Sequence, residues 1–243
     1  FSRFLIGLLF LLPFVIKDRD FKVDTRQWKF LILRNAAGVS NMLINFYVVK
    51  FLPLSIAVLL MNTSALFIPI LLLFFHQKTP LNVLLCSLIG FLGVSIILLT
   101  NHNGNVDPIY VLIGLSGAVL AGMAFIGLQE LNKYNTPKNI VFYFHLIGTF
   151  MLPVFFINQW KIPNLYELGL LLLVGGFGLI FQLLLTRAFK YAPANIITPF
   201  AFTGVVFSSV FDWLFWHHTP NLYFWLGAVI IVGAVSLLAK LKK

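Results

Sequence analysis

Charged residues are scarce in this chain, and acidic residues are the scarcest of them. Only 10% of the 243 residues are charged and only seven are Asp or Glu, whereas 60% are hydrophobic. A soluble domain carries about 25% charged residues, so the composition excludes a soluble protein. Apolar runs of roughly 20 residues, the length that crosses the hydrocarbon core of a bilayer, recur with short polar breaks. We predict one all-α, polytopic membrane domain.

Residues and motifs that carry chemistry are also missing. The single cysteine, Cys86, excludes an intramolecular disulfide and a CxxC metal site. His217 and His218 are adjacent beside a predicted turn, and without further ligands they do not indicate zinc. The chain has no GxSxG, HExxH or P-loop motif, and no GxGxxG between a strand and a helix. We therefore expect no cofactor, no bound metal and no enzymatic activity.

Nine membrane spans are predicted from the apolar runs. They cover residues 1–16, 31–49, 53–75, 80–100, 108–128, 138–157, 165–186, 193–216 and 219–239. A short polar residue followed by proline marks four helix starts, at Thr79-Pro80, Asp107-Pro108, Thr136-Pro137 and Thr219-Pro220. The polar side chain can accept a hydrogen bond from a free amide of the first turn, and proline lacks the amide hydrogen that has no partner there.

The chain matches itself without a gap when it is shifted by 140 positions. The matches include Pro13 with Pro153, Pro53 with Pro193, Pro80 with Pro220, Gly38 with Gly178, Gly93 with Gly233, and Thr63 with Thr203. The pattern predicts two repeats, at residues 1–103 and 104–243. In this alignment the span at 108–128 pairs with a helix before residue 1, so we expect a first helix that this sequence lacks. Because five helices are an odd number, the two repeats would have inverted topology, as in many secondary transporters.

Basic residues sort to one side of the predicted membrane. If the segment from Lys17 to Lys29 is cytoplasmic, alternation of the spans places 14 of the 17 Lys and Arg residues on that side, leaving Arg3, Lys50 and Lys161 outside. This bias follows the positive-inside rule and explains the net charge of +10 without nucleic acid. It predicts a multi-pass protein of the inner (plasma) membrane with a cytoplasmic C-terminus.

Polar residues inside spans are candidates for a substrate site, because they are costly where they face lipid. Arg34, Asn41 and Asn45 share one face of the span at 31–49, with Gly38 between them. One hypothesis is a cavity wall in which Arg34 attracts an anionic group and the asparagines bind substrate. The alternative is that Arg34 extends to the cytoplasmic headgroups and that the asparagines bond to neighbouring helices.

Equivalent positions of the two repeats carry a second polar set. Asn62 and Thr63 interrupt the middle of the span at 53–75, and Thr203 occupies the same depth of the span at 193–216. Mid-membrane polar residues at corresponding places of inverted repeats indicate a central binding site, and hydrogen bonds between helices are the alternative. Gln182 belongs to a small and polar stripe, Gly175, Gly178, Gln182 and Thr186, which would line a cavity or pack against a helix.

Ion coupling has few candidate residues. Proton coupling needs a carboxylate or a histidine in a desolvated place. The spans offer Glu130, Asp212 and His145, and an interfacial position is the alternative for each of them.

Three stretches of the sequence carry a family resemblance: residues 47–69, YVVKFLPLSIAVLLMNTSALFIP, residues 188–195, AFKYAPAN, and residues 90–94, GFLGV. In these stretches the sequence resembles the EamA-like, ten-helix branch of the drug/metabolite transporter superfamily. The resemblance implies ten helices with both termini cytoplasmic and a central cavity that alternates between the two sides of the membrane. The chain departs from the family pattern near Ala65 and Val205, where a mid-helix proline is common.

The resemblance and the residues together predict a transporter of a small polar metabolite, such as an amino acid or a related organic solute. Its partners would be the lipid bilayer and a small-molecule substrate, not nucleic acid, and it would be a monomer or a homodimer. The import or export direction and the coupling ion stay open. The alternatives are a non-transporting structural or receptor subunit and a membrane-embedded, lipid-modifying enzyme.

Overall fold

The computed structural model describes residues 1–19, 21, 23–52, 54–75, 77–99, 107–156, 163–217 and 222–241. All regular secondary structure in these residues is helical. Four helical segments are long and apolar enough to cross a membrane: Ile56–Phe74, Pro108–Leu131, Leu165–Ala188 and Leu222–Lys240. The predicted fold class, an all-α polytopic membrane bundle, is confirmed.

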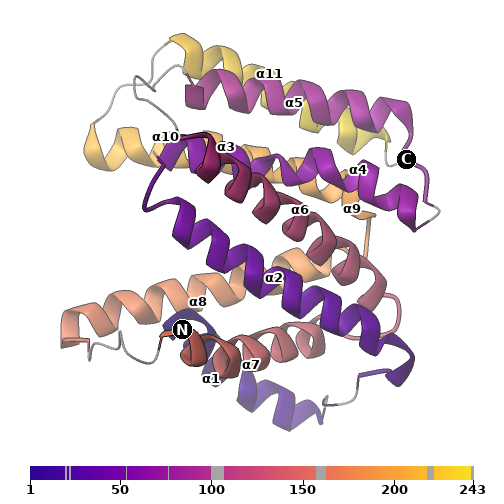
Figure 1. Cartoon of the computed structure of the whole chain (residues 1–243), viewed down its shortest axis with the longest axis vertical. Coiled ribbons are helices and arrows are strands. Elements are labelled where there is room, and N and C mark those ends of the chain that lie inside the picture. Colours follow the sequence, from indigo (N-terminus) through magenta and orange to yellow (C-terminus); the bar gives the residue numbers. More distant parts are fainter. Residues whose placement is uncertain are drawn as a thin grey trace. The chain divides into compact units, whose positions relative to one another are not determined.

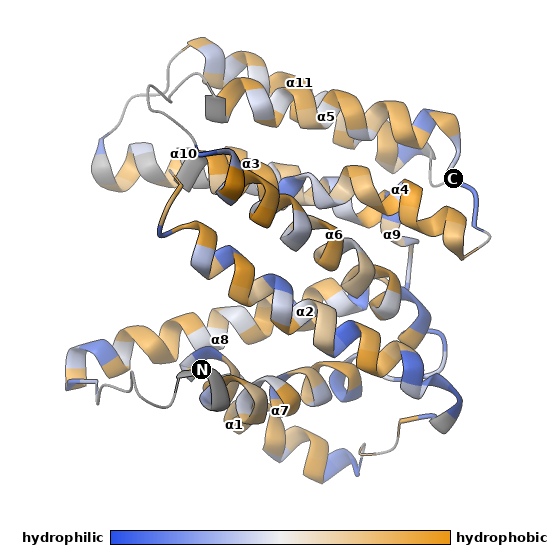
Figure 2. Cartoon of the chain, viewed as in Figure 1, coloured by the Kyte–Doolittle hydropathy of each residue, from blue (hydrophilic) through white to orange (hydrophobic). Residues whose placement is uncertain are grey.

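Each predicted span corresponds to one helix or to one interrupted helix (Figure 1). In chain order the elements are α1 (Ser2–Asp18), η1 (Thr25–Gln27), α2 (Trp28–Val48), α3 (Leu54–Asn62), α4 (Ser64–Phe74), α5 (Leu81–Leu99), α6 (Pro108–Leu131), α7 (Pro137–Phe156), α8 (Leu165–Ala188), α9 (Ala194–Ile197), η3 (Thr198–Phe202), α10 (Thr203–Trp216) and α11 (Leu222–Leu241). Hydrophobic residues cover most of the length of α5 and α11 (Figure 2), as a segment inside a bilayer requires.

Helices begin at three of the four predicted polar-proline signals, at Leu81, Pro108 and Pro137, and the predicted side-chain cap forms at two of them. Asp107 Oδ1 accepts a hydrogen bond from the Ile109 amide at 2.9 Å at the start of α6, and Thr136 Oγ1 accepts one from the Asn139 amide at 3.2 Å at the start of α7. Thr79 differs, because its hydroxyl accepts a hydrogen bond from Asn195 Nδ2 at 3.2 Å. Thr219 and Pro220 lie outside the described residues.

Two spans that the sequence predicts as continuous are interrupted. Thr63 separates α3 from α4, and the 3-10 helix η3 separates α9 from α10. Pro199 lies within η3, and a proline removes one hydrogen bond of the helical ladder and favours such a break. The first interruption is Thr63 itself, and the second ends just before Thr203, the first residue of α10 and 140 positions after Thr63.

The chain folds into two compact units. Unit 1 comprises Phe1–Val39 and Gly127–Tyr191, and unit 2 comprises Ser40–Ile126 and Ala192–Lys243. Each unit therefore takes residues from both predicted sequence repeats. The repeat boundaries at 1–103 and 104–243 remain a prediction about the sequence.

Unit 1 is built on α1, which packs against α7 and α8. Its core includes Leu11, Val15, Val141, Phe142 and Leu179. A Cβ on Gly175 would lie 2.5 Å from Ile6 Cγ2, so α8 approaches α1 closely at this glycine. Gly175 of the small and polar stripe thus serves helix packing, because its missing side chain admits the neighbouring helix.

Unit 2 is centred on the pairing of α5 with α11, which run side by side (Figure 1). Their backbones meet at Gly93 and Gly227: a Cβ on Gly227 would lie 2.6 Å from the Gly93 carbonyl oxygen. On α6, Cβ atoms on Gly114 and Gly122 would lie 2.7 Å from Leu60 and 2.8 Å from Leu71, respectively. Small residues thus permit close helix approach at both places, as expected where lipid supplies no hydrophobic driving force.

Candidate functional site

Arg34 is a buried cation in the middle of unit 1. Its side chain is 4% exposed, and its Nη2 donates a hydrogen bond to Gln182 Oε1 of α8 at 3.2 Å. The guanidinium carbon lies 4.1 Å from the centre of the Phe144 ring of α7, a cation–π contact. The two predicted site residues Arg34 and Gln182 are therefore brought together, although they are 148 positions apart.

Gly38 makes room for this guanidinium. A Cβ on Gly38 would collide with Arg34 Nη1 and would lie 3.0 Å from Phe144 Cε2. Gly38 is the central residue of the 21-residue helix α2, so the Arg34 side chain extends from its own turn toward the middle of the helix. A side chain that reached for the headgroups would extend the other way, toward the start of α2 at Trp28.

Burying the charge of Arg34 is costly, because a charge that leaves water without an opposite partner loses its hydration. Its Nε is buried and has no hydrogen-bond partner among the described residues. A polar residue kept in such a place indicates a functional site more than a packing role.

Asn41 and Asn45 bond to each other in unit 2. Asn45 Nδ2 donates a hydrogen bond to Asn41 Oδ1 at 2.9 Å, one helical turn away. A Cβ on Gly117 of α6 would lie 3.5 Å from Asn41 Oδ1, so this pair faces a small residue. Both asparagines are half-buried, which leaves their remaining polar atoms available to a solute.

Thr63 and Thr203 make the same local contact at the two helix interruptions. Thr63 Oγ1 donates a hydrogen bond to the Leu60 carbonyl at 2.5 Å, and Thr203 Oγ1 donates one to the Phe200 carbonyl at 2.7 Å. Both acceptors lie three residues earlier, and they too are 140 positions apart. In both cases the backbone amide of the threonine also bonds to the same carbonyl, so the hydroxyl adds a second, local hydrogen bond.

Asn62 is anchored to its own helix, with Nδ2 donating to the Val58 carbonyl at 2.9 Å. Like Thr63 and Thr203, it is half-buried. A Cβ on Gly204, next to Thr203, would meet no atom within 4 Å. Open space therefore adjoins the second interruption.

His145 is fully enclosed in unit 1. It is 1% exposed, and its Nδ1 donates a hydrogen bond to the Val141 carbonyl at 2.9 Å. The ring packs edge-on against Phe4 and Phe144, with ring-centre distances of 5.7 and 5.9 Å. A Cβ on Gly7 would collide with the imidazole, so α1 approaches α7 closely beside this residue.

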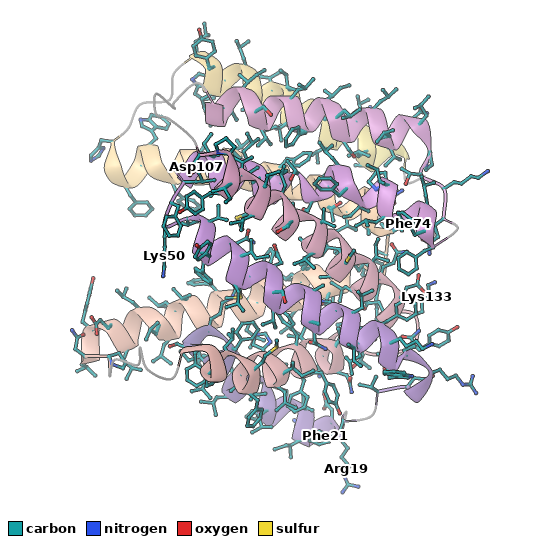
Figure 3. The ribbon with its side chains drawn as sticks, viewed as in Figure 1. Arg19, Phe21, Lys50, Phe74, Asp107 and Lys133 are labelled. Atoms are coloured by element: carbon teal, nitrogen blue, oxygen red, sulfur yellow. The ribbon has the colours of Figure 1, made fainter. Side chains whose placement is uncertain are left out.

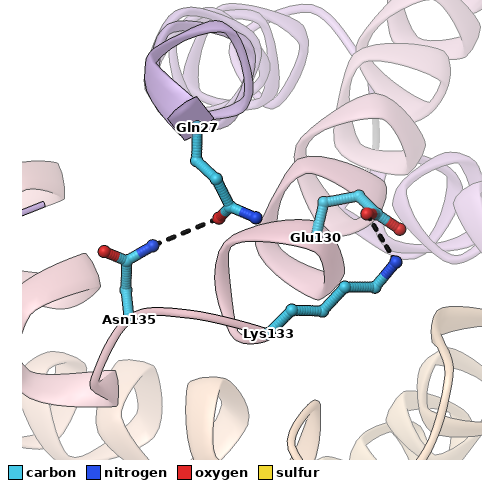
Figure 4. A network of polar contacts seen from close by, with 4 residues as sticks. All are labelled: Gln27, Glu130, Lys133 and Asn135. Carbon is cyan, nitrogen blue, oxygen red and sulfur yellow. Dashed lines mark hydrogen bonds and ion pairs between the residues drawn. The ribbon is translucent and has the colours of Figure 1, made fainter. Parts of the chain in front are cut away.

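Glu130 lies near the end of α6 and is paired there. Lys133 Nζ donates to Glu130 Oε2 at 2.6 Å, and nearby Asn135 Nδ2 donates to Gln27 Oε1 at 3.2 Å (Figure 4). Figure 3 shows Asp107 and Lys133 at the opposite ends of α6. Asp212 belongs to α10, but its side chain lies outside the described residues. The coupling roles of Glu130, Asp212 and His145 remain predictions.

Sequence reasoning missed Phe144 and Thr149 as neighbours of the buried polar groups. Phe144 has no signal of its own among 27 phenylalanines. Thr149 lies one turn after His145, and Thr186 lies one turn after Gln182; both hydroxyl oxygens are buried without a hydrogen-bond partner among the described residues. In the sequence, the spacing of four residues between these polar side chains indicates that each pair shares one face of its helix.

Comparison with known proteins identifies relatives across the whole chain. The family model described as "EamA-like transporter family" matches residues 1–99 and 108–240. The pseudopaline exporter CntI of Pseudomonas aeruginosa is 29% identical, over 100% of this chain and 86% of that protein. A riboflavin transporter of Brucella anthropi is 23% identical over 96% of this chain and 84% of that protein.

An S-adenosylmethionine uptake transporter of Rickettsia bellii is 27% identical, over 96% of this chain and 80% of that protein. A protein of known crystal structure superposes with a TM-score of 0.82, over 99% of this chain and 87% of that chain, at 15% identity. Because that identity is low, the superposition establishes a shared fold alone.

Proposed function

The chain belongs to the EamA-like transporter family, and we propose that it carries a small polar organic solute across the inner membrane by alternating access. It is a multi-pass membrane transporter of the drug/metabolite type rather than an enzyme. An amino acid or a related metabolite is the proposed substrate class. The proposed orientation follows the positive-inside rule, with the C-terminus in the cytoplasm.

The matched helix interruptions carry this proposal. Thr63 and Thr203 occupy equivalent positions of the two sequence repeats, and each hydroxyl bonds to the carbonyl three residues before it. Interrupted helices at corresponding places of two repeats are the typical location of the substrate site in secondary transporters. The uncharged polar groups Asn41, Asn45 and Asn62 lie in the same unit and suit hydrogen bonding to a polar solute.

The relatives support transport without deciding its direction. One is named an exporter and another an uptake transporter. We propose that the solute, not the fold, differs between such proteins, because a fold supports many functions while the side chains of the site determine recognition.

A double substitution at the interruptions tests the proposal. Asn62→Ala with Thr203→Val removes two polar groups of unit 2 while preserving approximate side-chain volume at position 203. We expect uptake or efflux of the identified solute to fall to the background of cells without the protein, with membrane abundance unchanged. Metabolite profiling of cells with and without the protein identifies the solute first.

A matched control is Ser95→Ala on α5, because the Ser95 hydroxyl bonds back to the Phe91 carbonyl of its own helix at 2.9 Å. This variant should transport normally. Normal transport by the double variant would contradict the site assignment, and absence of transport for every solute profiled would contradict the function.

A further inference from the structure

Arg34 has no counterion among the described residues. Apart from the Phe144 ring, its partner is the neutral amide oxygen of Gln182, at 3.2 Å from Nη2. Its Nε has no partner in the described part of the chain, although the residue is only 4% exposed. A buried charge is normally compensated by an opposite charge with good hydrogen-bond geometry, so Arg34 is a buried positive charge whose negative partner is missing from the described part of unit 1.

The acidic residues of unit 1 are engaged elsewhere, at helix ends. Asp18 pairs with Lys138, Asp24 accepts a hydrogen bond from the Arg26 amide, Glu130 pairs with Lys133, and Glu167 forms a capping box with Asn164. Asp20 lies outside the described residues, in the sequence between α1 and η1. No acidic residue of the described part of unit 1 lies near the middle of a helix.

Other basic side chains approach the same region of unit 1. A Cβ on Gly178 of α8 would lie 2.7 Å from Arg3 Nε of α1. His145 of α7 packs against the same Phe144 ring as Arg34. Arg3 of α1 and Arg34 of α2 thus both approach α8, at Gly178 and at Gln182 one turn later. The hydroxyl oxygen of Thr186, one turn after Gln182, is buried and lacks a partner among the described residues, as does that of Thr149 on α7.

We infer that the transported solute carries an anionic group, a carboxylate or a phosphate, and that this group binds Arg34 in place of the Gln182 amide. The inference rests on the proposed transport function and names its substrate class. A guanidinium binds a carboxylate or a phosphate through two parallel hydrogen bonds. Gln182 offers one amide oxygen to the guanidinium, whereas a carboxylate or a phosphate offers two acceptor oxygens.

The contacts of Arg34 also explain how its buried guanidinium is accommodated when no solute is bound. The Gln182 amide and the Phe144 ring face the guanidinium and replace part of its hydration. An anion provides a full opposite charge, so it stabilises the folded protein that binds it. Ligands that bind the folded state alone raise its thermal stability by mass action.

The first test measures the thermal stability of the full chain, purified in detergent, with matched probes. The probes are succinate beside succinamide, glutamate beside glutamine, and glycerol 3-phosphate beside glycerol. We expect at least one anion to raise the melting temperature more than its neutral analogue, and the pair that does so distinguishes carboxylate from phosphate. Equal shifts within every pair would overturn the inference. Stabilisation by dihexanoyl phosphatidylglycerol alone would assign the charge to lipid and would also overturn it.

The second test builds the missing negative charge into the protein. Gln182→Glu keeps the side-chain length and places a carboxylate opposite Arg34. We expect this variant to melt at a higher temperature without ligand and to bind the stabilising anion at least about tenfold more weakly, since a charge-assisted bond is already made. Arg34→Gln should lose the anion response. Lys138→Gln, which removes a charge at a helix end of the same unit, should retain it.

A Gln182→Glu protein that melts lower than the parent and still binds the anion would overturn the inference. Transport assays separate this inference from the proposed function. If vesicles containing the protein transport neutral or cationic solutes but no anion, the function holds and the anionic substrate is wrong. If anions bind through Arg34 and no solute is transported, the transport function is wrong while the anion site stands.

Discussion

Unit 1 and unit 2 differ in how they satisfy polar groups. The side-chain hydrogen bonds of unit 1 include several between separate elements, such as Arg34 to Gln182 and Tyr143 to the Phe21 carbonyl. Those described for unit 2 mostly return to the same helix, such as Ser87 to Val83. Polar contacts therefore join the helices of unit 1, whereas close backbone approach joins α5 to α11 in unit 2. Separating two helices of unit 2 would therefore break few of the side-chain hydrogen bonds described there.

The largest effect is expected from a methyl group at the α5–α11 crossing. Gly227→Ala places a Cβ 2.6 Å from the Gly93 carbonyl oxygen, so the two helices must separate. We expect a loss of about 1–3 kcal/mol or more of stability, seen as a lower melting temperature by tryptophan fluorescence.

Gly233→Ala is the control on the same helix, because its Cβ would meet no atom within 4 Å. Alanine has a higher helix propensity than glycine by about 1 kcal/mol, so this variant should melt at the same temperature or higher. A similar decrease for both variants would contradict close packing at Gly227.

A smaller effect is expected at the polar junction of unit 1. Asn135 Nδ2 donates to Gln27 Oε1, and Asn135 Oδ1 accepts from the Asp24 amide at 3.1 Å. Asn135→Ala leaves these buried or half-buried partners unpaired, which costs about 1–3 kcal/mol of folding free energy. The measurement is thermal denaturation in detergent.

Ser87→Ala provides the comparison in unit 2. The Ser87 hydroxyl is fully buried and donates to the Val83 carbonyl of its own helix. When the hydroxyl is removed, that carbonyl keeps its backbone hydrogen bond within the helix. We expect a loss of about 1 kcal/mol or less. If Ser87→Ala proved as destabilising as Asn135→Ala, the difference between the units would not hold.

The smallest effect concerns the ion pair between Asp18 and Lys138, beyond the predicted span at 1–16. The hydrogen bond from Lys138 lowers the pKa of Asp18, with the charges of Lys138 and Lys17 adding to this against the opposing effect of burial. A lowered folded-state pKa gives stability that is present above the ordinary Asp pKa, about 3.9, and is lost as the pH falls through the folded-state value.

We therefore expect the stability difference between the parent and Lys138→Gln to be small at pH 7 and to disappear in acid as Asp18 becomes protonated, below the ordinary Asp pKa of about 3.9. Melting temperatures of both proteins across this range measure it. A difference that grows as the pH falls would contradict the assignment.

Several features of the fold could be predicted from local sequence. The helix starts at Asp107 and Thr136 depend on a side chain and a proline that are neighbours in the chain, so short-range patterns reveal them. The close packing of Gly114 and Gly122 likewise follows from their spacing on α6. The interruption at Thr63 was visible only as a polar residue in an apolar run, because the sequence does not say whether a hydroxyl bonds across helices or back to its own.

Hydrophobic length and residue spacing act within each helix, so the amino-acid sequence was enough to identify a helical membrane protein of a transporter family. Tertiary structure alone decided that Arg34 turns inward over Gly38 and meets Gln182 and Phe144. A basic residue near the start of a helix can extend toward the headgroups or into the bundle. Only the neighbours that the fold brings from α7 and α8 lower the energy of the inward orientation.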